Sequence, residues 1–308
     1  MKIVNSLSGG KTSSFMAVHF PADHNLFAVV CLDDPECRVK DPSLLRYAQD
    51  KLAAYSPEWG EFSGTAESDL TLAAMRDLEQ IMGQEIVWVR GPSFDTLLAG
   101  RQTRLPSWAR RYCTADMKIA PIAQWVFMNL AAPTEAISPP KKKEVPYGYK
   151  NTICNVEMRI GLRADEPNRV WRMREKADAG IFNFPICQKI DTRRHTNKKM
   201  LYRTVRMPLA DEGIKNRDVK AYWRGREITF PEVSNCVGCF HKAAPVINAQ
   251  FAIEPEKMRW FANAEKLGMG TWHDTRVTYD AISRMKFTGR LPLDHDLYSA
   301  CDTGGCTD

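Results

Sequence analysis

A short glycine-bearing loop near the start of the chain has the residue types needed to bind an anion. Residues 8–13 read Ser-Gly-Gly-Lys-Thr-Ser, between an apolar run and a segment that can start a helix. Adjacent glycines let the backbone turn sharply and approach a ligand closely. The N–H groups of the loop and of the helix N-terminus converge where a phosphate or sulfate can sit. The ammonium of Lys11 and the hydroxyls of Ser8, Thr12 and Ser13 add donors, which predicts an anion site.

This loop is not a Walker A motif. That motif requires a glycine five positions before the glycine of its Gly-Lys pair, and Asn5 is there instead. An ordinary glycine-rich turn between a strand and a helix is the alternative. If the loop binds a nucleotide, we expect contacts from Ser6, Ser8, Gly9, Gly10, Lys11, Thr12 and Ser13.

A second chemical feature is the Cys-x-x-Cys knuckle of Cys236 and Cys239, with Gly238 in its turn. Such a knuckle presents two thiolates to one metal ion. Zinc and a 4Fe–4S cluster normally need four ligands, so the others must come from elsewhere in the chain. Cys113 is the third candidate, and a pair of structural thiols is the alternative. The candidates for the fourth place are Cys306, Cys301 and His241.

Cys113 follows Arg110 and Arg111 and stands immediately before a predicted helix. A helix N-terminus and neighbouring guanidinium groups both lower the pKa of a thiol, which suits a metal ligand or a reactive thiolate. A buried cysteine at a helix start is the alternative. Lys118 lies on the first turns of the same helix, where its ammonium can reach an anion.

A turn containing Gly161 and Arg163 follows another predicted strand, so we expect it at the carboxyl edge of the sheet beside the nucleotide site. The guanidinium of Arg163 can bind a phosphate or sulfate through two parallel hydrogen bonds, and Glu166 or Asp165 can orient it. A surface salt-bridge loop is the alternative. Asp33 follows the second predicted strand and is our candidate for contacting the adenosine of a bound nucleotide.

Composition limits the classes of function. The chain has 308 residues, 44% of them hydrophobic, and a net charge of +6, which suits anionic partners. Basic clusters occur at residues 141–143 and 193–199, and a solvated loop accounts for the first. Nine cysteines predict core thiols together with a metal or redox site. No apolar run of about 18 residues and no signal-peptide pattern is present, so we expect a cytoplasmic protein without membrane association.

The elements that must position these residues alternate between strand and helix, which predicts an α/β fold with a Rossmann-like parallel sheet and a cysteine-containing C-terminal extension. Residues 1–232 are predicted to form the nucleotide-binding domain, with a mobile loop at about 131–150, and residues 233–308 a segment packed on it. Strands are predicted at residues 2–7, 26–32, 85–89, 154–160 and 201–207, and helices from residue 12 and at 42–55, 70–82, 114–130 and 216–223.

In this order, the segments resemble the phosphoadenosine phosphosulfate (PAPS) reductase family, in its divergent phage and mobile-element branch, within the adenine nucleotide alpha-hydrolase (PP-loop) superfamily. Residues 8–13 are similar to the superfamily's SGGKD(S/T) loop, with Thr12 where its ATP-using branches have Asp. The family's R-x-C-T-x-x-x-K-x-x-P, G-(I/L)-R and Cys-x-x-Cys segments are matched by Arg111 to Pro121, Gly161 to Arg163 and Cys236 to Cys239. Thr114 stands where the iron–sulfur branch has a second cysteine, and the C-terminal Glu-Cys-Gly-(I/L)-His motif of sulfonucleotide reductases is missing.

The resemblance implies a sheet of the adenine nucleotide alpha-hydrolase type and an enzyme of sulfur transfer, redox or adenylation chemistry, with nucleic-acid modification among the reactions. Its ligands would be ATP, PAPS or APS, with Mg²⁺, and a 4Fe–4S cluster held by Cys113, Cys236, Cys239 and Cys306, with Cys301 as the alternative fourth ligand. Zinc is the alternative metal. Lys11, Lys118 and Arg163 would be the catalytic residues, and nucleic acid or an enzyme that binds it the partner. The alternative functions are an ATP pyrophosphatase-type ligase with structural zinc and a non-catalytic nucleotide-binding regulator.

Overall fold

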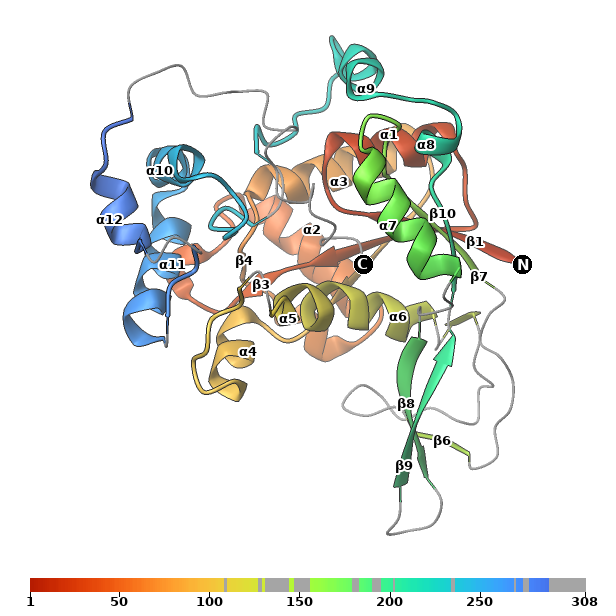
Figure 1. Ribbon diagram of the computed structural model, residues 1–308, viewed down its shortest axis with the longest axis horizontal. Helices are drawn as coiled ribbons and strands as arrows, with labels where there is room; N and C mark the ends of the chain where they lie inside the picture. The colour runs from red at the N-terminus through yellow and green to blue at the C-terminus, as the bar shows by residue number, and fades with distance from the viewer. Residues whose placement is uncertain are drawn as a thin grey trace.

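The centre of the molecule, seen in a computed structural model, is a five-stranded parallel sheet in the order β10-β7-β1-β2-β5 (Figure 1). Its strands are β1 (Lys2–Leu7), β2 (His24–Val29), β5 (Ile86–Arg90), β7 (Val156–Ile160) and β10 (Thr204–Arg206). The structure describes residues 1–107, 110–126, 129–130, 144–146, 156–178, 183–189, 195–201, 203–233, 236–268, 270–273 and 277–287, with backbone alone for 144–146, 183–189 and 195–201.

Helices cover both faces of this sheet, so the predicted Rossmann-like α/β fold is confirmed. Side chains alternate across each strand: Leu26 and Ala28 join a core on one face, while Phe27 and Val29 join a core on the other. One face is covered by α6 (Ala120–Val126) and α7 (Pro167–Asp178). The other is covered by α1 (Lys11–His19), α2 (Pro42–Ala53), α3 (Asp69–Met82) and α9 (Asn216–Trp223).

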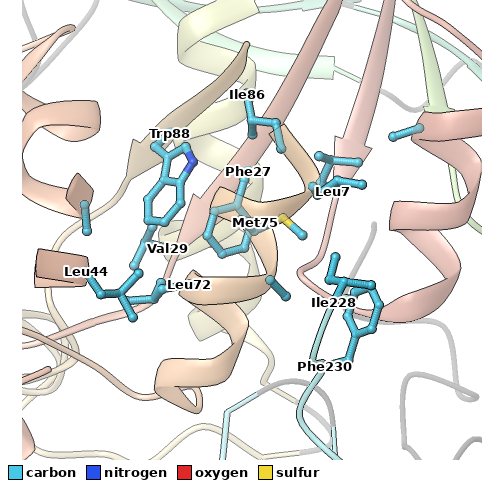
Figure 2. Close-up of a cluster of buried hydrophobic side chains, with 14 of the residues drawn as sticks. Leu7, Phe27, Val29, Leu44, Leu72, Met75, Ile86, Trp88, Ile228 and Phe230 are labelled. Carbon is cyan, nitrogen blue, oxygen red and sulfur yellow. The ribbon is translucent and has the colours of Figure 1, made fainter. Parts of the chain in front are cut away.

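The core on the α2 and α3 side contains the largest buried side chains of the sheet. Figure 2 shows Phe27 and Trp88 from the strands beside Leu72 and Met75 of α3. The rings of Phe27 and Trp88 meet edge to face, with centroids 5.1 Å apart. Fully burying a side chain of this kind stabilises the fold by roughly 1.5–3 kcal/mol, so this layer holds α3 and the loop it contacts in place.

The predicted strand at residues 26–32 is interrupted at Val30, and its two parts belong to different sheets. The chain leaves the central sheet after β2, and Cys31–Leu32 form β3, which pairs antiparallel with β4 (Gly64–Thr65). The carbonyl of Val30 explains the break, because it accepts from the amide of Ala66 at 2.9 Å and from the hydroxyl of Thr65 at 2.9 Å. Pairing with this second segment ends pairing with β5.

The predicted strand at residues 201–207 is also wrong in extent, because two elements share it. Leu201 ends β9 (His195–Leu201), which pairs antiparallel with β8 (Asn183–Lys189), and the central strand is only β10. The predicted loop at 131–150 contains a strand, β6 (Glu144–Pro146), parallel to β8. Residues 131–143 and 147–150 lie outside the described residues.

The helix predicted at 114–130 is interrupted. It begins as α5 (Tyr112–Thr114), widens into a π-helical turn, η3 (Ala115–Ile119), and continues as α6. Gly91 permits the close packing here, since a Cβ on it would lie 2.4 Å from the carbonyl oxygen of Asp116. π-helical turns occur often at functional sites, and this one carries Lys118.

The C-terminal part of the chain packs on the sheet domain through a third core, in which Val30, Leu32 and Phe94 meet Phe261 and Trp272. The domain boundary at residue 232 stays a prediction. No helix within the described ranges is long and apolar enough to cross a membrane. The remaining elements are α4 (Phe94–Gly100), α8 (Pro208–Asp211), α10 (Ala244–Ile253), α11 (Pro255–Leu267), α12 (Tyr279–Arg284), η1 (Pro35–Cys37) and η2 (Pro57–Gly60).

Candidate functional site

The loop at residues 8–13 and the turn at residues 161–163 meet at one point of the sheet. Strand order reverses between β1 and β7, and ligands of open α/β sheets bind outside the carboxyl ends of strands at such a point. Ser6 pairs in register with Ile160, so the two segments leave the sheet side by side. A Cβ on Gly161 would lie 3.1 Å from the Cα of Ser13, so glycine permits this approach.

The loop is shaped by its own backbone and serine hydroxyls. Gly9 has a φ of +77°, and a Cβ there would lie 2.2 Å from Cγ2 of Thr71, so only glycine fits without a shift. The hydroxyl of Ser13 accepts from the amide of Ser8 at 3.1 Å and donates to the carbonyl of Gly10 at 3.1 Å. Ser13 therefore holds the loop closed, rather than offering its hydrogen to a ligand.

The start of α1 presents uncapped amides and a cation. Gly10 is the N-cap residue, and no side chain caps the first turn of the helix. The carbonyl of Lys11 accepts from Nε1 of Trp223 at 2.9 Å, which ties the loop to α9. No described carboxylate forms an ion pair with the Lys11 ammonium. Uncapped first-turn N–H groups beside such a charge are the kind of groups that attract an anion.

Arg163 is held against this loop by three of its neighbours. Its Nη1 donates to Oγ1 of Thr12 at 2.8 Å, and its Nε donates to Oδ1 of Asp165 at 3.2 Å. Glu166 accepts from the Arg163 amide at 2.9 Å and forms an ion pair with Arg169. Because Arg163 is only 7% exposed, these contacts fix the guanidinium at the edge of the loop.

The carboxylates near the loop are already engaged. Oδ2 of Asp165 accepts from the amide of Asn216 at 2.9 Å, while Oδ1 faces Arg163. Partial burial works to raise the pKa of Asp165, but the hydrogen bond from Asn216 and the charge of Arg163 outweigh it, and the pKa is lowered. Asp165 therefore stays ionised and serves to orient Arg163, as the sequence predicted it can.

Asp33 lies at the end of β3, beyond the central sheet. Its carboxylate accepts from the hydroxyl of Ser93, and its amide donates to Oδ2 of Asp95 at 2.8 Å. Oδ1 of Asp95 accepts from Nε1 of Trp260 at 2.9 Å. These bonds tie Asp33 to the start of α4 and to α11. Its contact with an adenosine stays a prediction.

The three cysteines predicted to act together do come from neighbouring parts of the structure. The thiols of Cys113 and Cys239 and the charges of Lys118 and Glu67 all act electrostatically on Cys236. Burial raises the pKa of the Cys236 thiol well above its ordinary value, and the positive charge of Lys118 opposes this. Cys236 therefore needs a further positive charge or a metal to become a thiolate.

Glu67 is a residue that sequence reasoning missed. Its side chain is fully buried, and Oε1 accepts from Nζ of Lys118 at 2.8 Å. Among the described residues, Oε2 has no hydrogen-bond partner. The Glu67 carbonyl accepts from Nζ of Lys257 at 2.6 Å, and that ammonium also reaches Asp69 at 2.7 Å. No motif marks Glu67, because a single acidic residue before a helix is typical of a cap.

The knuckle itself is held rigidly. A Cβ on Gly238 would lie 2.3 Å from Cγ of Phe261, so glycine is required where the knuckle crosses this ring. The Tyr279 hydroxyl donates to the Gly238 carbonyl at 3.0 Å, and Nζ of Lys242 donates to the Cys236 carbonyl at 2.7 Å. The turn that bears Cys236 and Cys239 is thus fixed from two sides.

The described residues alone do not fit a metal site, because no three of their His, Cys, Asp or Glu side chains come together in a way that could hold an ion. Cys301 and Cys306 lie outside the described residues. His241 is buried, and its pKa is lowered to about 4 by burial and by the charge of Arg111, so it is neutral at pH 7. Cys31 and Cys37 are core thiols, whose pKa burial raises to about 12.

Comparison of the chain with protein-family models, with curated proteins and with solved structures found no match.

Proposed function

We propose that this protein is a nucleotide-dependent enzyme similar to the PAPS reductases, which binds the anionic end of an adenine nucleotide at the loop of residues 8–13. One observation carries the proposal: the loop after β1 and the Arg163 turn after β7 converge where the strand order reverses. Uncapped amides, Lys11 and Arg163 all present positive charge there. A phosphate or sulfate is the ligand that this set of groups fits.

The donor set favours an anion that arrives without a bridging magnesium ion. Protein-bound Mg²⁺ is usually held by one or two carboxylates as well as by substrate phosphates. The loop has Thr12 instead of a carboxylate, and both oxygens of Asp165 face other partners. We therefore infer that a sulfonucleotide, PAPS or APS, binds better than Mg²⁺·ATP.

Lys118 and Arg163 are the residues that we infer to stabilise charge at the reacting centre. Each is positioned by carboxylates, Lys118 by Glu67 at 2.8 Å and Arg163 by Asp165 at 3.2 Å. Positioned cations of this kind stabilise charge that develops in a transition state, since they need no reorganisation during the reaction. A metal centre is a separate part of the proposal, since the described residues alone hold no group that fits an ion. Iron, sulfide and zinc analysis of the purified protein tests it.

The experiment that tests the proposal is an anaerobic product assay. Purified protein receives PAPS, APS or ATP with reductant, with and without Mg²⁺, and the nucleotides, sulfite and pyrophosphate are separated. Sulfite from PAPS or APS without added Mg²⁺ is the expected result. AMP and pyrophosphate from Mg²⁺·ATP would instead support the ATP pyrophosphatase-type ligase. Binding without turnover of any nucleotide would support the regulator and overturn the enzyme proposal. A Lys11→Ala variant is the control for turnover at this loop.

A further inference from the structure

A cationic hairpin projects from the edge of the sheet domain. β8 and β9 extend away from the body of the molecule, below α6 and α7 in Figure 1. Their sequences, NFPICQK and HTNKKML, contain Lys189, His195, Lys198 and Lys199 and no acidic residue. A ribbon with cations and without carboxylates attracts a polyanion along its length.

The helix before this hairpin carries an exposed aromatic ring among further cations. Trp171 of α7 is 59% exposed, although most tryptophans in folded proteins are largely buried. Arg172 beside it is exposed, and Arg174, one turn along, is exposed and forms an ion pair with Asp211 at 3.0 Å. α7 as a whole has four arginine or lysine residues and two acidic ones.

These elements are continuous with the edge of the candidate nucleotide site. α7 begins at Pro167, directly after the turn in which Arg163 contacts Thr12. The hairpin follows α7 along the chain and leads into β10, the edge strand of the central sheet, where the Arg206 side chain is 62% exposed. We call α7, β8 and β9 the basic arm.

We propose that the basic arm binds a single-stranded segment of nucleic acid, with phosphates along the cations of the hairpin and a base stacked on Trp171. The stacking component favours a nucleic acid, because a base offers an aromatic face at each phosphate step whereas other polyanions do not. An unpaired strand is favoured over a duplex for the same reason, since duplex bases are already stacked. Binding of nucleic acid by the basic arm does not depend on the proposed function. Only the further step, in which the bound strand is the acceptor for chemistry at the loop, rests on it.

The test is fluorescence anisotropy with a labelled single-stranded DNA over a range of salt concentrations, using the whole protein. Two variants address the two components of the arm. Lys198→Gln with Lys199→Gln removes adjacent cations, which alternate between the faces of a strand. Each phosphate contact contributes about 0.7 to the salt slope, and a nucleic-acid strand on one face meets only one of the two cations. We therefore expect the slope to fall by about 0.7 and affinity to fall by roughly fivefold. Trp171→Ala is expected to lower affinity by roughly fivefold or more, and Trp171→Phe to restore most of it.

Matched controls lie on α11, far along the chain from the arm. Arg259→Gln with Lys266→Gln removes two exposed cations, and Leu267→Ala removes an apolar side chain that is 78% exposed. Both controls should leave DNA binding unchanged. An equal loss of DNA affinity in the α11 charge variant would overturn the inference. Tighter binding of the matching duplex than of the single strand would do the same, and so would the absence of DNA binding at low salt.

The same variants separate this inference from the proposed function. Lys11→Ala should lose nucleotide binding and keep DNA binding, whereas the hairpin variant should do the reverse. If PAPS, APS and ATP all fail to bind while DNA binds through the arm, the proposed function alone fails. If a nucleotide binds and DNA does not, the inference about the arm alone fails.

Discussion

The loop of residues 8–13 and the cysteine region, which comprises Cys236 and the groups around it, differ in how they are assembled. The loop is continuous in the chain and its shape comes from local bonds, such as those of Ser13 to Ser8 and Gly10. The cysteine region takes its groups from distant parts of the chain, with Glu67 after β4, Lys118 on the π-helical turn and Cys236 near the C-terminal helices. Loss of one contact should therefore have a local effect in the loop, and should affect several distant segments in the cysteine region.

A second difference concerns solvent. The first turn of α1 is uncapped and Lys11 is half-buried, so this loop can receive a ligand without breaking protein contacts. Glu67 and Lys118 are paired out of solvent, where a charge that loses its partner is costly. The loop therefore leaves donors open to a ligand, whereas the ion pair of Glu67 and Lys118 contributes to stability. Variants of the loop should therefore change ligand affinity, and variants of the ion pair should change the free energy of unfolding.

The largest expected effect is on stability, from Glu67→Gln. Removing one charge of a buried pair typically costs about 3–5 kcal/mol, because the other charge stays buried. We expect the free energy of unfolding in urea to fall by that amount, with nucleotide affinity changed less than about twofold. Exposed Glu58→Gln is the control, and a further change of Lys118→Met should recover much of the loss. A large loss of nucleotide affinity without loss of stability would reverse the comparison.

The next effect is on binding, from Lys11→Ala. Truncating a charged group that contacts a ligand anion costs about 2–5 kcal/mol, so we expect calorimetry to show affinity for PAPS lower by roughly 100-fold. Stability should change by less than about 0.5 kcal/mol, because no described side chain pairs with this ammonium. Lys286→Ala, an exposed lysine outside both regions, should have no effect on affinity. An affinity unchanged by Lys11→Ala would show that the anion binds elsewhere.

A smaller effect is expected from Thr12→Val, which removes the acceptor of the Arg163 hydrogen bond at 2.8 Å. A net hydrogen bond contributes about 0.5–1.5 kcal/mol, so affinity for the nucleotide should fall by about two- to tenfold. Thr12→Ser keeps the hydroxyl and should bind normally. If Thr12→Val binds more tightly than the parent protein, the bond to Thr12 competes with the ligand for Arg163.

The smallest effect concerns pH. The pKa of Asp165 is lowered below its ordinary value of 3.8, so its contribution to stability is complete above that pH and is lost as pH falls through the lowered pKa. Asp165→Asn should flatten the acid limb of the stability curve and cost less than about 1 kcal/mol at pH 7, because the side chain is 36% exposed and screened. Urea unfolding over a range of pH values measures both the acid limb and the loss of stability at pH 7. An unchanged acid limb would mean that the contact with Arg163 does not persist in solution.

The parallel sheet and the place of the glycine-bearing loop after its first strand could be predicted from the amino-acid sequence. Lys2–Leu7 and Asn216–Trp223 form the predicted strand and helix, because a local apolar pattern and local helix spacing are properties of short segments. The contact between the loop and the Arg163 turn follows from the parallel sheet, which brings carboxyl ends of strands to one edge.

The ends of the strands and the pairing of charges depend instead on contacts between distant segments. The carbonyl of Val30 bonds to a segment about 35 residues later, and Leu201 pairs in a hairpin instead of the central sheet. Glu67 becomes important only because Lys118 reaches it from another element at 2.8 Å. Such pairings depend on distances between segments far apart in the chain, which no local pattern of residues encodes.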